Sequence, residues 1–298
     1  MSYPTSGLWM CGDRRIQLSS ADPAVHDVSW VWDASIADDI PPDRRDWLYS
    51  IDEVKPVTHD GEACLLLTAS WRGAVALLRR RDRTLLFLAP LPNAHSADLL
   101  PGGWVAAAGS VGSDCLNIYH LSSGLLTTGP RLSLSLPHGH GVVYEPAHSR
   151  FWVCGDQLLR AYHWRAHGDT FACTLEREII LPDHDAHDLM VDAAGTGLII
   201  TTKRHVWRFD PVTAVVSPFA LLADANDVKS VTYAADGTLA YTKAVGGTIY
   251  KTNEIVFVRP DGQLHRRHVP GGFLYKVRWD RTCQLSGAGR GHGGMAQG

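Results

Sequence analysis

Six residues that could hold an anion, bind a metal ion or transfer a proton recur along this chain at nearly regular intervals. They are 40 to 47 residues apart and follow the order Lys55, His95, His140, His187, Lys229 and Lys276. Most stand shortly before a turn and an apolar run, as His140 stands before Pro146 and the run at 151–154. A period of roughly 40–50 residues with several short strands per unit is typical of a β-propeller. We therefore expect each residue to open the first strand of a blade and to face one central channel.

The three histidines open consecutive repeats, so their imidazoles could converge. Channel positions of adjacent blades lie about 8–10 Å apart at the backbone, which is two inter-strand spacings. Three imidazoles with open positions suit a divalent transition ion such as Zn²⁺, Mn²⁺, Fe²⁺ or Ni²⁺. We expect His95, His140 and His187 to bind one such ion, and we expect no organic cofactor. Metal-free acid–base or binding chemistry is one alternative, and hydrogen bonding to the channel backbone is the other.

Other side chains near these positions could support the site. His138 and His184 are second candidates as ligands, and Asp98 or Asp188 could orient a ligand imidazole. Aromatic residues either form a wall of the site or belong to the core; these are Trp71, Tyr275 and Trp279.

Lysine is used sparingly, and half of it falls at the repeated positions. The chain has six lysines among 28 basic residues, and three of them are Lys55, Lys229 and Lys276. Lysine supplies a compact charge with an adjustable pKa, which suits binding of a carboxylate, phosphate or sulfate. We expect these three, together with Ser230 and Arg278, to bind an anionic substrate. Ammonium groups packed without a counter-ion should repel one another; three solvated strand-end lysines are the alternative.

The fold expected is all-β: a single six-bladed propeller over residues 1–285. Strand-like runs bounded by Gly, Pro, Asp and Asn divide the chain into repeats at 50–90, 91–137, 138–182, 183–223 and 224–269, with a short remainder at 270–285. Residues 7–33 supply the missing outer strands of that last blade, which hides open sheet edges. A Gly-rich tail at 286–298 should be disordered.

Bulk properties exclude several classes of protein. The net charge of −3 and the isoelectric point near 6.6 argue against a nucleic-acid or anionic-membrane partner. We find no membrane-length apolar run and no signal peptide. The six cysteines form no C-x-x-C pair and are expected to be mostly buried thiols. Since no signal peptide is found, a reducing cytoplasm is the predicted location. The chain is expected to be a monomer or dimer.

Several segments together carry a family resemblance; they are 54–57, 93–102, 138–144, 151–155, 187–189, 228–231 and 275–279. They resemble a bacterial family of six-bladed propellers known only as a domain of unknown function, with an architecture like that of TolB and of propeller-type lyases. The likeness covers roughly residues 5–280 and implies the fold, but hardly the chemistry. More distantly, the histidines are similar in idea to those of propeller-type oligouronide lyases, which bind a divalent metal through channel histidines.

These observations favour a metal-dependent lyase, isomerase or cyclase that acts on a small carboxylate-bearing substrate, such as a uronide or a natural-product intermediate. The lysines would hold the anion and the metal would polarise it, while His140, His187 or Lys229 moves the proton. A non-catalytic binding module for an anionic ligand or sugar is the first alternative, and a metal-dependent hydrolase is the second. A protein-interaction scaffold would explain the fold but not the repeated channel residues.

Overall fold

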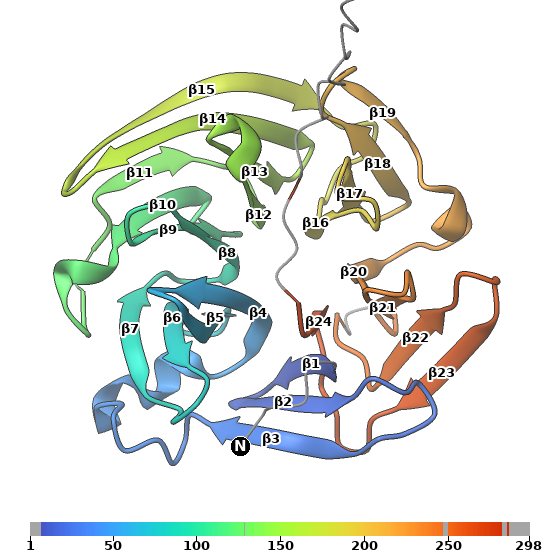
Figure 1. Cartoon of the computed structure of the whole chain (residues 1–298), viewed down its shortest axis with the longest axis horizontal. Helices are drawn as coiled ribbons and strands as arrows, with labels where there is room; N and C mark the ends of the chain where they lie inside the picture. The colour runs from blue at the N-terminus through green and yellow to red at the C-terminus, as the bar shows by residue number, and fades with distance from the viewer. Residues whose placement is uncertain (1–6, 128, 247–249, 282–284, 286–298) are drawn as a thin grey trace, which may run out of the picture.

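The computed structural model describes residues 7–127, 129–246, 250–281 and 285, and its strands form six four-stranded antiparallel blades around a central axis (Figure 1). Blade one contains β4 (Ile51–His59), β5 (Glu62–Ala69), β6 (Ala74–Arg79) and β7 (Leu85–Pro90). Blade two contains β8 (Ala94–Leu100), β9 (Trp104–Gly109), β10 (Cys115–His120) and β11 (Leu132–Ser135). Blade three contains β12 (Gly139–Glu145), β13 (Arg150–Gly155), β14 (Leu158–His167) and β15 (Thr170–Ile180).

The second half of the ring repeats this order. Blade four contains β16 (Asp188–Val191), β17 (Leu198–Thr201), β18 (Val206–Asp210) and β19 (Val215–Pro218). Blade five contains β20 (Val228–Tyr233), β21 (Leu239–Lys243), β22 (Glu254–Val258) and β23 (Leu264–His268). Blade six contains β24 (Val277–Trp279), β1 (Gly7–Gly12), β2 (Arg15–Ser20) and β3 (Val28–Asp33). The six-bladed propeller expected from the repeat period is confirmed.

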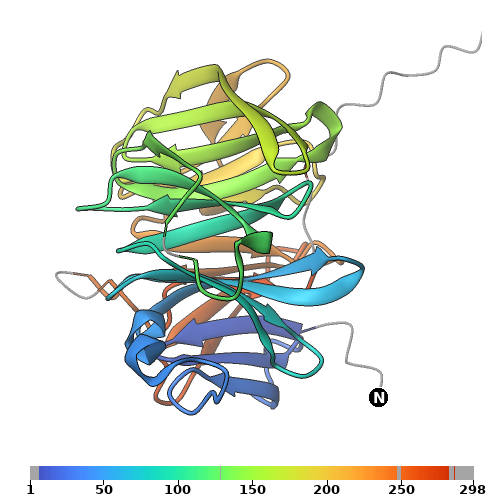
Figure 2. The ribbon, with the colours of Figure 1, turned by 90° about the vertical axis from the view of Figure 1, so that its left-hand side faces the viewer.

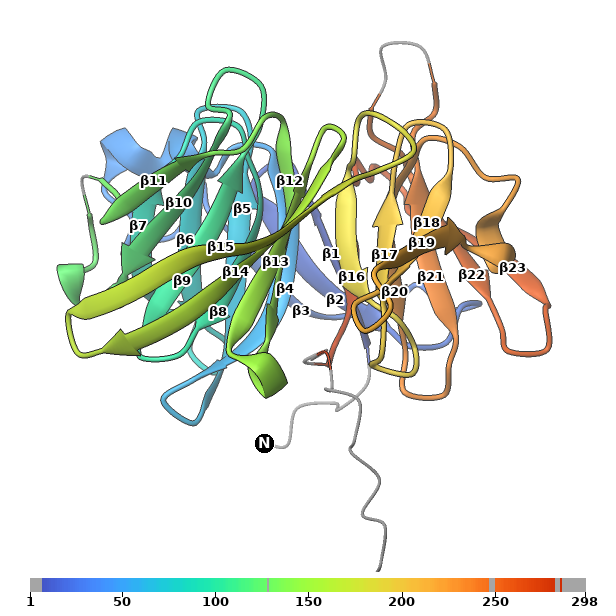
Figure 3. The ribbon, with the colours of Figure 1, turned by 90° about the horizontal axis from the view of Figure 1, so that it is seen from above.

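In the described part of the chain, helical structure is confined to short connections. The 3₁₀ segments are η1 (Pro42–Leu48), η2 (Leu121–Ser123), η3 (Pro146–His148) and η4 (Ala220–Leu222). Turned by 90°, the blades appear as stacked layers (Figure 2), and from above they stand side by side across the molecule (Figure 3). Among the described residues, no helix is long and apolar enough to cross a membrane.

The two ends of the chain share blade six, as the sequence predicted. Strand β1 pairs with β24 through Leu8 opposite Trp279 and Met10 opposite Val277. A polar contact strengthens the closure, because Asp280 accepts hydrogen bonds from Trp9 Nε1 at 2.9 Å and from Arg80 Nη2 at 2.9 Å. Closure by paired strands leaves the ring without an open edge between its first and last blades. The expected tail at 286–298 lies outside the described residues.

The hydrophobic core lies between neighbouring blades rather than at the axis. Between blades six and one, Trp9 packs against Trp30 at a centroid distance of 5.2 Å, within a cluster that includes Leu65 and Leu78. Burial of each such large side chain contributes about 1.5–3 kcal/mol. Because the apolar faces are used between blades, the innermost strands are free to carry polar groups toward the axis.

The innermost strands of four blades share a β-bulge at the same place. The register shifts between Ile51 and Glu53, between Ala94 and Ser96, between Gly139 and Gly141, and between Val228 and Ser230. The residues passed over are therefore Asp52, His95, His140 and Lys229. A bulge leaves one residue outside the ladder and redirects its side chain. These four side chains are thus presented by a repeated backbone feature.

The five described cysteines are free thiols, and Cys11, Cys64 and Cys154 are buried as expected. Burial raises the pKa of the Cys154 thiol to about 12, so this thiol is not a nucleophile near neutral pH. Cys283 lies outside the described residues.

Candidate active site at the channel rim

Hydrogen bonds between blades define which residues are equivalent around the axis. In three places, a backbone N–H of one innermost strand donates to a side chain of the strand before it. These bonds are Val142 N to Ser96 Oγ at 3.1 Å, Val231 N to Asp188 Oδ2 at 3.0 Å, and Val277 N to Ser230 Oγ at 3.1 Å. Together with the bulges, they make one ring of equivalent positions. We call it the rim ring: Asp52, His95, His140, His187, Lys229 and Tyr275.

This alignment corrects two members of the set read from the sequence. Lys55 comes three residues after the ring position Asp52, and Lys276 comes one residue after the ring position Tyr275. His95, His140, His187 and Lys229 keep their places. The error arose because lysines were matched by residue type, whereas the backbone register places an aspartate and a tyrosine at those two points.

The three histidines of the rim ring lie in a row. His95 stacks on His140 with ring centroids 4.3 Å apart and an interplanar angle of 20°, and His140 meets the edge of His187 at 5.2 Å. The ring of Tyr275 packs against that of His95, with ring centroids 5.3 Å apart. His95 and His140 are 9% and 8% exposed, so the row is enclosed but still touches the surface.

His140 is held in one tautomer by the backbone. Its Nδ1 lies 2.8 Å from the carbonyl oxygen of His138, so Nδ1 carries the proton and donates it. Nε2 is therefore left with a lone pair. Burial, with the nearby His95, holds the pKa of His140 well below its usual range. His140 is thus a neutral imidazole with a free acceptor nitrogen, as a general base requires.

His187 and Lys229 form a direct pair. Lys229 Nζ lies 2.7 Å from His187 Nε2, and Asp227 Oδ1 is 3.8 Å from the same ammonium. Burial lowers the pKa of Lys229 to about 8, and burial with the neighbouring His140 lowers the pKa of His187 well below its usual value. When Lys229 donates to Nε2, the proton of His187 resides on Nδ1, a buried nitrogen that has no hydrogen-bond partner among the described atoms.

Asp52 and His95 form the other polar contact of the rim ring. His95 Nδ1 lies 3.4 Å from Asp52 Oδ2, while His95 Nε2 contacts Asn93 Oδ1 at 3.0 Å. Burial raises the pKa of Asp52 although Lys251 lies 3.0 Å from its Oδ1. Burial, together with Lys276 and Lys251, lowers the pKa of His95 to about 3. His95 is therefore neutral at physiological pH.

Below the rim ring, the channel is filled by paired charges. Arg278 donates to Glu53 Oε1 at 2.9 Å and to Asp188 Oδ2 at 3.0 Å, and Lys276 lies 3.1 Å from Asp188 Oδ1. Lys276 also donates to the carbonyl of His140 at 2.7 Å. Although burial opposes it, the pKa of Glu53 is held below its usual range by Arg278 and Lys276. We call this group the channel plug.

The channel plug changes the role expected for several substrate-binding residues. Lys276, Arg278 and Ser230 are 0% exposed, and each is held by hydrogen-bond or ion-pair partners inside the protein. Ser230 instead bonds Thr242 Oγ1 at 2.8 Å, and Lys55 donates to the carbonyl of Val142 at 2.8 Å. The expectation of three uncompensated ammoniums is wrong. Lys55 is 3.8 Å from Asp98, Lys229 has Asp227 and Lys276 has Asp188.

The remaining sequence candidates also find definite places. Asp98 and Asp188 do not orient an imidazole, because they accept from the backbone N–H groups of Tyr144 at 2.9 Å and Val231 at 3.0 Å. Tyr275 lies in the rim ring. Trp279 packs on Phe257 in the core, whereas Trp71 is 71% exposed and its ring contacts that of Tyr49.

The expected metal ligands do not converge on one point. Stacked imidazoles such as those of His95 and His140 cannot both direct their in-plane lone pairs at a single ion. Within the part of the chain that the structure describes, one group of three potential ligands has its donor atoms within 4.8 Å of one another, and it consists of His138, Asp156 and Asp185. His138, named from the sequence only as a second candidate, belongs to it.

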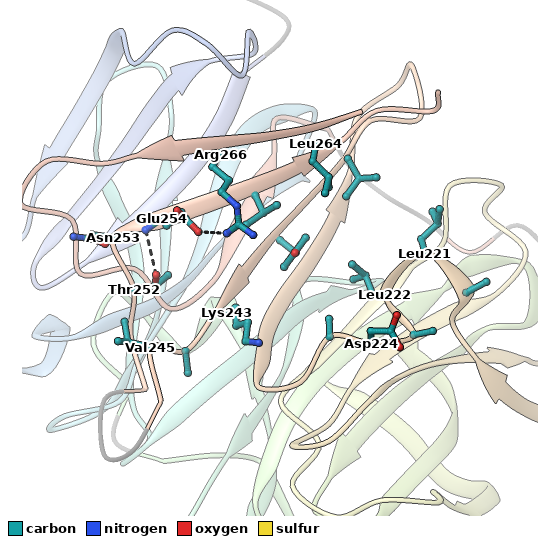
Figure 4. A pocket seen from close by; sticks show the side chains of 17 residues that line it. Leu221, Leu222, Asp224, Lys243, Val245, Thr252, Asn253, Glu254, Leu264 and Arg266 are labelled. Atoms are coloured by element: carbon teal, nitrogen blue, oxygen red, sulfur yellow. Dashed lines mark hydrogen bonds and ion pairs between the residues drawn. The ribbon is translucent and has the colours of Figure 1, made fainter. Parts of the chain in front are cut away.

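A surface groove between blades four and five offers less chemistry than the rim. It is lined by η4 and strands β21 to β23, with apolar residues such as Leu222 and Leu264 (Figure 4). Its Glu254 and Arg266 pair with each other at 2.5 Å. The described residues that line it include neither histidine nor cysteine. At the rim ring, by contrast, three histidines contact one another beside a lysine whose pKa is lowered.

Sequence reasoning missed Asp52, Asp156 and Asp185, and it named Tyr275 only as a residue of a wall or of the core, not as an equivalent of the histidines. For Asp52 and for the ring position of Tyr275, a signal was present: the apolar residue two positions after each ring residue aligns the six innermost strands, as Val54, Val142 and Val277 illustrate. Asp156 follows Gly155 in a hairpin loop, and only the fold brings that loop beside Asp185. No sequence spacing would have shown that contact.

The chain belongs to a family of unknown function (DUF6528), whose model matches residues 11–279. No curated protein matches the chain. Among solved structures, a protein of unknown function from Bacteroides caccae is 12% identical with a TM-score of 0.56, covering 93% of this chain and 99% of that one. A "putative 6-phosphogluconolactonase" from Bacteroides uniformis is 13% identical with a TM-score of 0.57, covering 92% and 84%. A hypothetical selenium-binding protein from Sulfolobus tokodaii is 11% identical with a TM-score of 0.56, covering 90% and 76%. At such identities, the likeness shows the fold alone.

Proposed function

We propose that this propeller is an enzyme that transfers a proton on a small carboxylate-bearing substrate, as a lyase, isomerase or cyclase does, at the rim ring. The observation that carries the proposal is the 2.7 Å contact between His187 Nε2 and Lys229 Nζ, next to a neutral His140 whose Nε2 has a free lone pair. A base and an acid of this kind, held side by side, are what removal and return of a C–H proton require.

The roles follow from the protonation states. His140 stays neutral because its pKa is well below the usual range, so its Nε2 is the base. Lys229, with a pKa of about 8, is the acid and the cation assigned to the substrate carboxylate; it is 1% exposed, so direct contact requires its side chain to move. His187 fixes the position of the ammonium and presents Nδ1–H as a further donor. The anion-binding role assigned to Lys55, Lys276 and Arg278 passes to Lys229, because the other three belong to the channel plug or its surroundings.

Exchange of substrate hydrogen with D₂O tests the proposal without knowledge of the final product. The purified chain is incubated in D₂O with a panel of uronates and of 2-oxo and 2-hydroxy acids, and loss of C–H signals is followed by NMR. We expect exchange with at least one of these acids, a decline in rate as pH rises through about 8, and a loss of about 10²-fold or more in His140→Gln and Lys229→Met.

A matched control and two outcomes make the test decisive. His59→Gln changes a histidine at the far end of β4 and should leave exchange unchanged. If carboxylates raise the melting temperature but no hydrogen exchanges, the chain is a binding module and the enzyme proposal is wrong. If the panel is hydrolysed at ester or lactone bonds without C–H exchange, a hydrolase replaces it.

A further inference from the structure

A cluster of possible ligands stands beside the rim ring, on three loops, and the proton-transfer proposal uses none of its side chains. His138 directly precedes β12, Asp156 lies between β13 and β14, and Asp185 precedes β16. Their donor atoms lie within 4.8 Å of one another, and His138 Nδ1 is 3.9 Å from Asp185 Oδ1. We call these three residues the rim triad.

The backbone holds the rim triad in place before any ligand arrives. His138 N–H donates to Asp114 Oδ1 at 2.9 Å, and Ala186 N–H donates to the carbonyl of Asp156 at 2.9 Å, which joins the loops of blades three and four. Gly155 approaches the neighbouring loop so closely that a Cβ there would lie 2.3 Å from the carbonyl oxygen of Pro137. The three ligand-bearing loops therefore cannot separate without breaking these contacts.

The carboxylates of the rim triad lack the cationic partners that other acids of this chain have. Asp33 pairs with Arg15 at 2.7 Å and Asp82 with Arg79 at 3.0 Å. Among the ion pairs between described residues, Asp156 and Asp185 contact only histidines. Two carboxylates this close repel each other unless a cation lies between them.

A third observation lies on the same loop. His187 Nδ1, two residues after Asp185, is a buried donor with no partner among the described atoms. Buried polar groups are normally hydrogen-bonded, so this N–H calls for a water or a ligand oxygen at the rim. The negative charge of Asp185 also acts on Lys229 and Tyr275, which places the rim triad beside the rim ring.

We propose that a divalent transition-metal ion binds His138, Asp156 and Asp185, and that its open coordination positions take the carboxylate of the substrate. One imidazole and two carboxylates suit Mn²⁺, Fe²⁺ or Zn²⁺ better than the all-oxygen sites of Mg²⁺ and Ca²⁺. Metal–ligand bonds of about 2.1 Å require the donor atoms to close by roughly 1 Å, which rotation of half-exposed side chains can supply. His184, whose Nδ1 lies 3.2 Å from Asp156 Oδ1, orients that carboxylate from outside.

The second half of this proposal rests on the proposed function; the first half does not. The sequence assigned metal binding to His95, His140 and His187. The proposed site instead uses His138 and Asp185, which lie two residues before His140 and His187 in the sequence. The imidazole nitrogens of the rim ring are then available for proton transfer. The ion provides positive charge for the substrate carboxylate, because the cations of the channel plug are already paired with carboxylates.

Direct binding of Mn²⁺ tests the ion site with no substrate present. Metal-free chain is titrated with Mn²⁺, and free ion is read by electron paramagnetic resonance; Zn²⁺ is titrated by calorimetry. We expect one ion per chain and a loss of about tenfold or more in affinity in Asp185→Asn and in His138→Gln. The matched control is Asp169→Asn, which changes another His–Asp pair, 3.8 Å from His120, and should bind as the unaltered chain does.

Each outcome bears on a separate claim. If the unaltered chain binds neither ion, or if both rim-triad variants bind like Asp169→Asn, the metal site is refuted. If Mn²⁺ binds at the triad but C–H exchange proceeds equally well after chelation, capture of the carboxylate by the ion is refuted, while the proton-transfer function stands. If metal binds and no exchange occurs with or without it, the proposed function fails and the ion site remains.

Discussion

Replacement of Lys229 by methionine should stabilise the protein near neutral pH, although it removes a hydrogen bond. Burial lowers the pKa of Lys229 from 10.5 to about 8, so the folded state disfavours the ammonium relative to the unfolded chain. Below about pH 8 both states are protonated, and the full penalty applies. Each pKa unit corresponds to about 1.4 kcal/mol, so the penalty is about 3 kcal/mol. The lost contact with His187 is worth about 1 kcal/mol, which leaves a net gain of about 2 kcal/mol at pH 7.

The pH dependence separates this reasoning from a simple packing effect. Between pH 8 and 10.5 the folded chain has released the proton while the unfolded chain still holds it, so the penalty disappears as pH rises through this window. Urea denaturation of both proteins at pH 7 and near pH 10 measures the gap. Lys203→Met is the control, since Lys203 is half-exposed and pairs with Asp227 at 3.3 Å. A gap that is independent of pH, or a variant that is less stable at pH 7, would refute the assigned burial penalty.

Two further predictions concern His95 and the channel plug. Since the pKa of His95 is lowered to about 3, its ring should not titrate by NMR between pH 5 and 8, and the unaltered chain should lose about 2–3 kcal/mol more stability than His95→Asn between pH 7 and 4.5; a ring that titrates near pH 6.5 would contradict this. Glu53→Gln should cost about 3–5 kcal/mol in urea denaturation because it leaves the buried Arg278 partly unpaired, whereas Glu62→Gln on the surface should cost less than about 1 kcal/mol; equal costs would show that the plug is not a tightly paired network.

The sequence predicted the fold well because the repeat period, the turns and the closing strands are all local patterns. The repeat boundaries at 50–90 and 138–182 agree with blades one and three, and the assignment of residues 7–33 to the last blade agrees with the pairing of β1 and β24. Each of these features depends on the alternation of apolar and polar residues and on the spacing of turns, which can be read directly from the sequence.

The candidate site was predicted less completely because it depends on register and on contacts between blades. A bulge moves a side chain by one position without changing composition, so Lys55 and Lys276 could be mistaken for members of the rim ring. The pairing of Lys276 with Asp188, residues 88 positions apart, and that of Asp156 with the loop before β16, follow only from the closed ring. Charge compensation of this kind is invisible until the chain is folded.

The division of the axis into two levels explains how one channel can carry so many charges and still be reactive. In the channel plug, Arg278 and Lys276 are completely buried and each pairs with a carboxylate. These ion pairs join different blades, so the two cations do not bind a substrate. In the rim ring, burial keeps the imidazoles neutral and lowers the pKa of one ammonium into the range where it exchanges protons. Burial of these groups provides the low polarity on which those shifts depend. Chemistry is therefore expected at the rim alone, and substitutions in the plug should act through stability, whereas those at His140 and Lys229 should act on proton transfer.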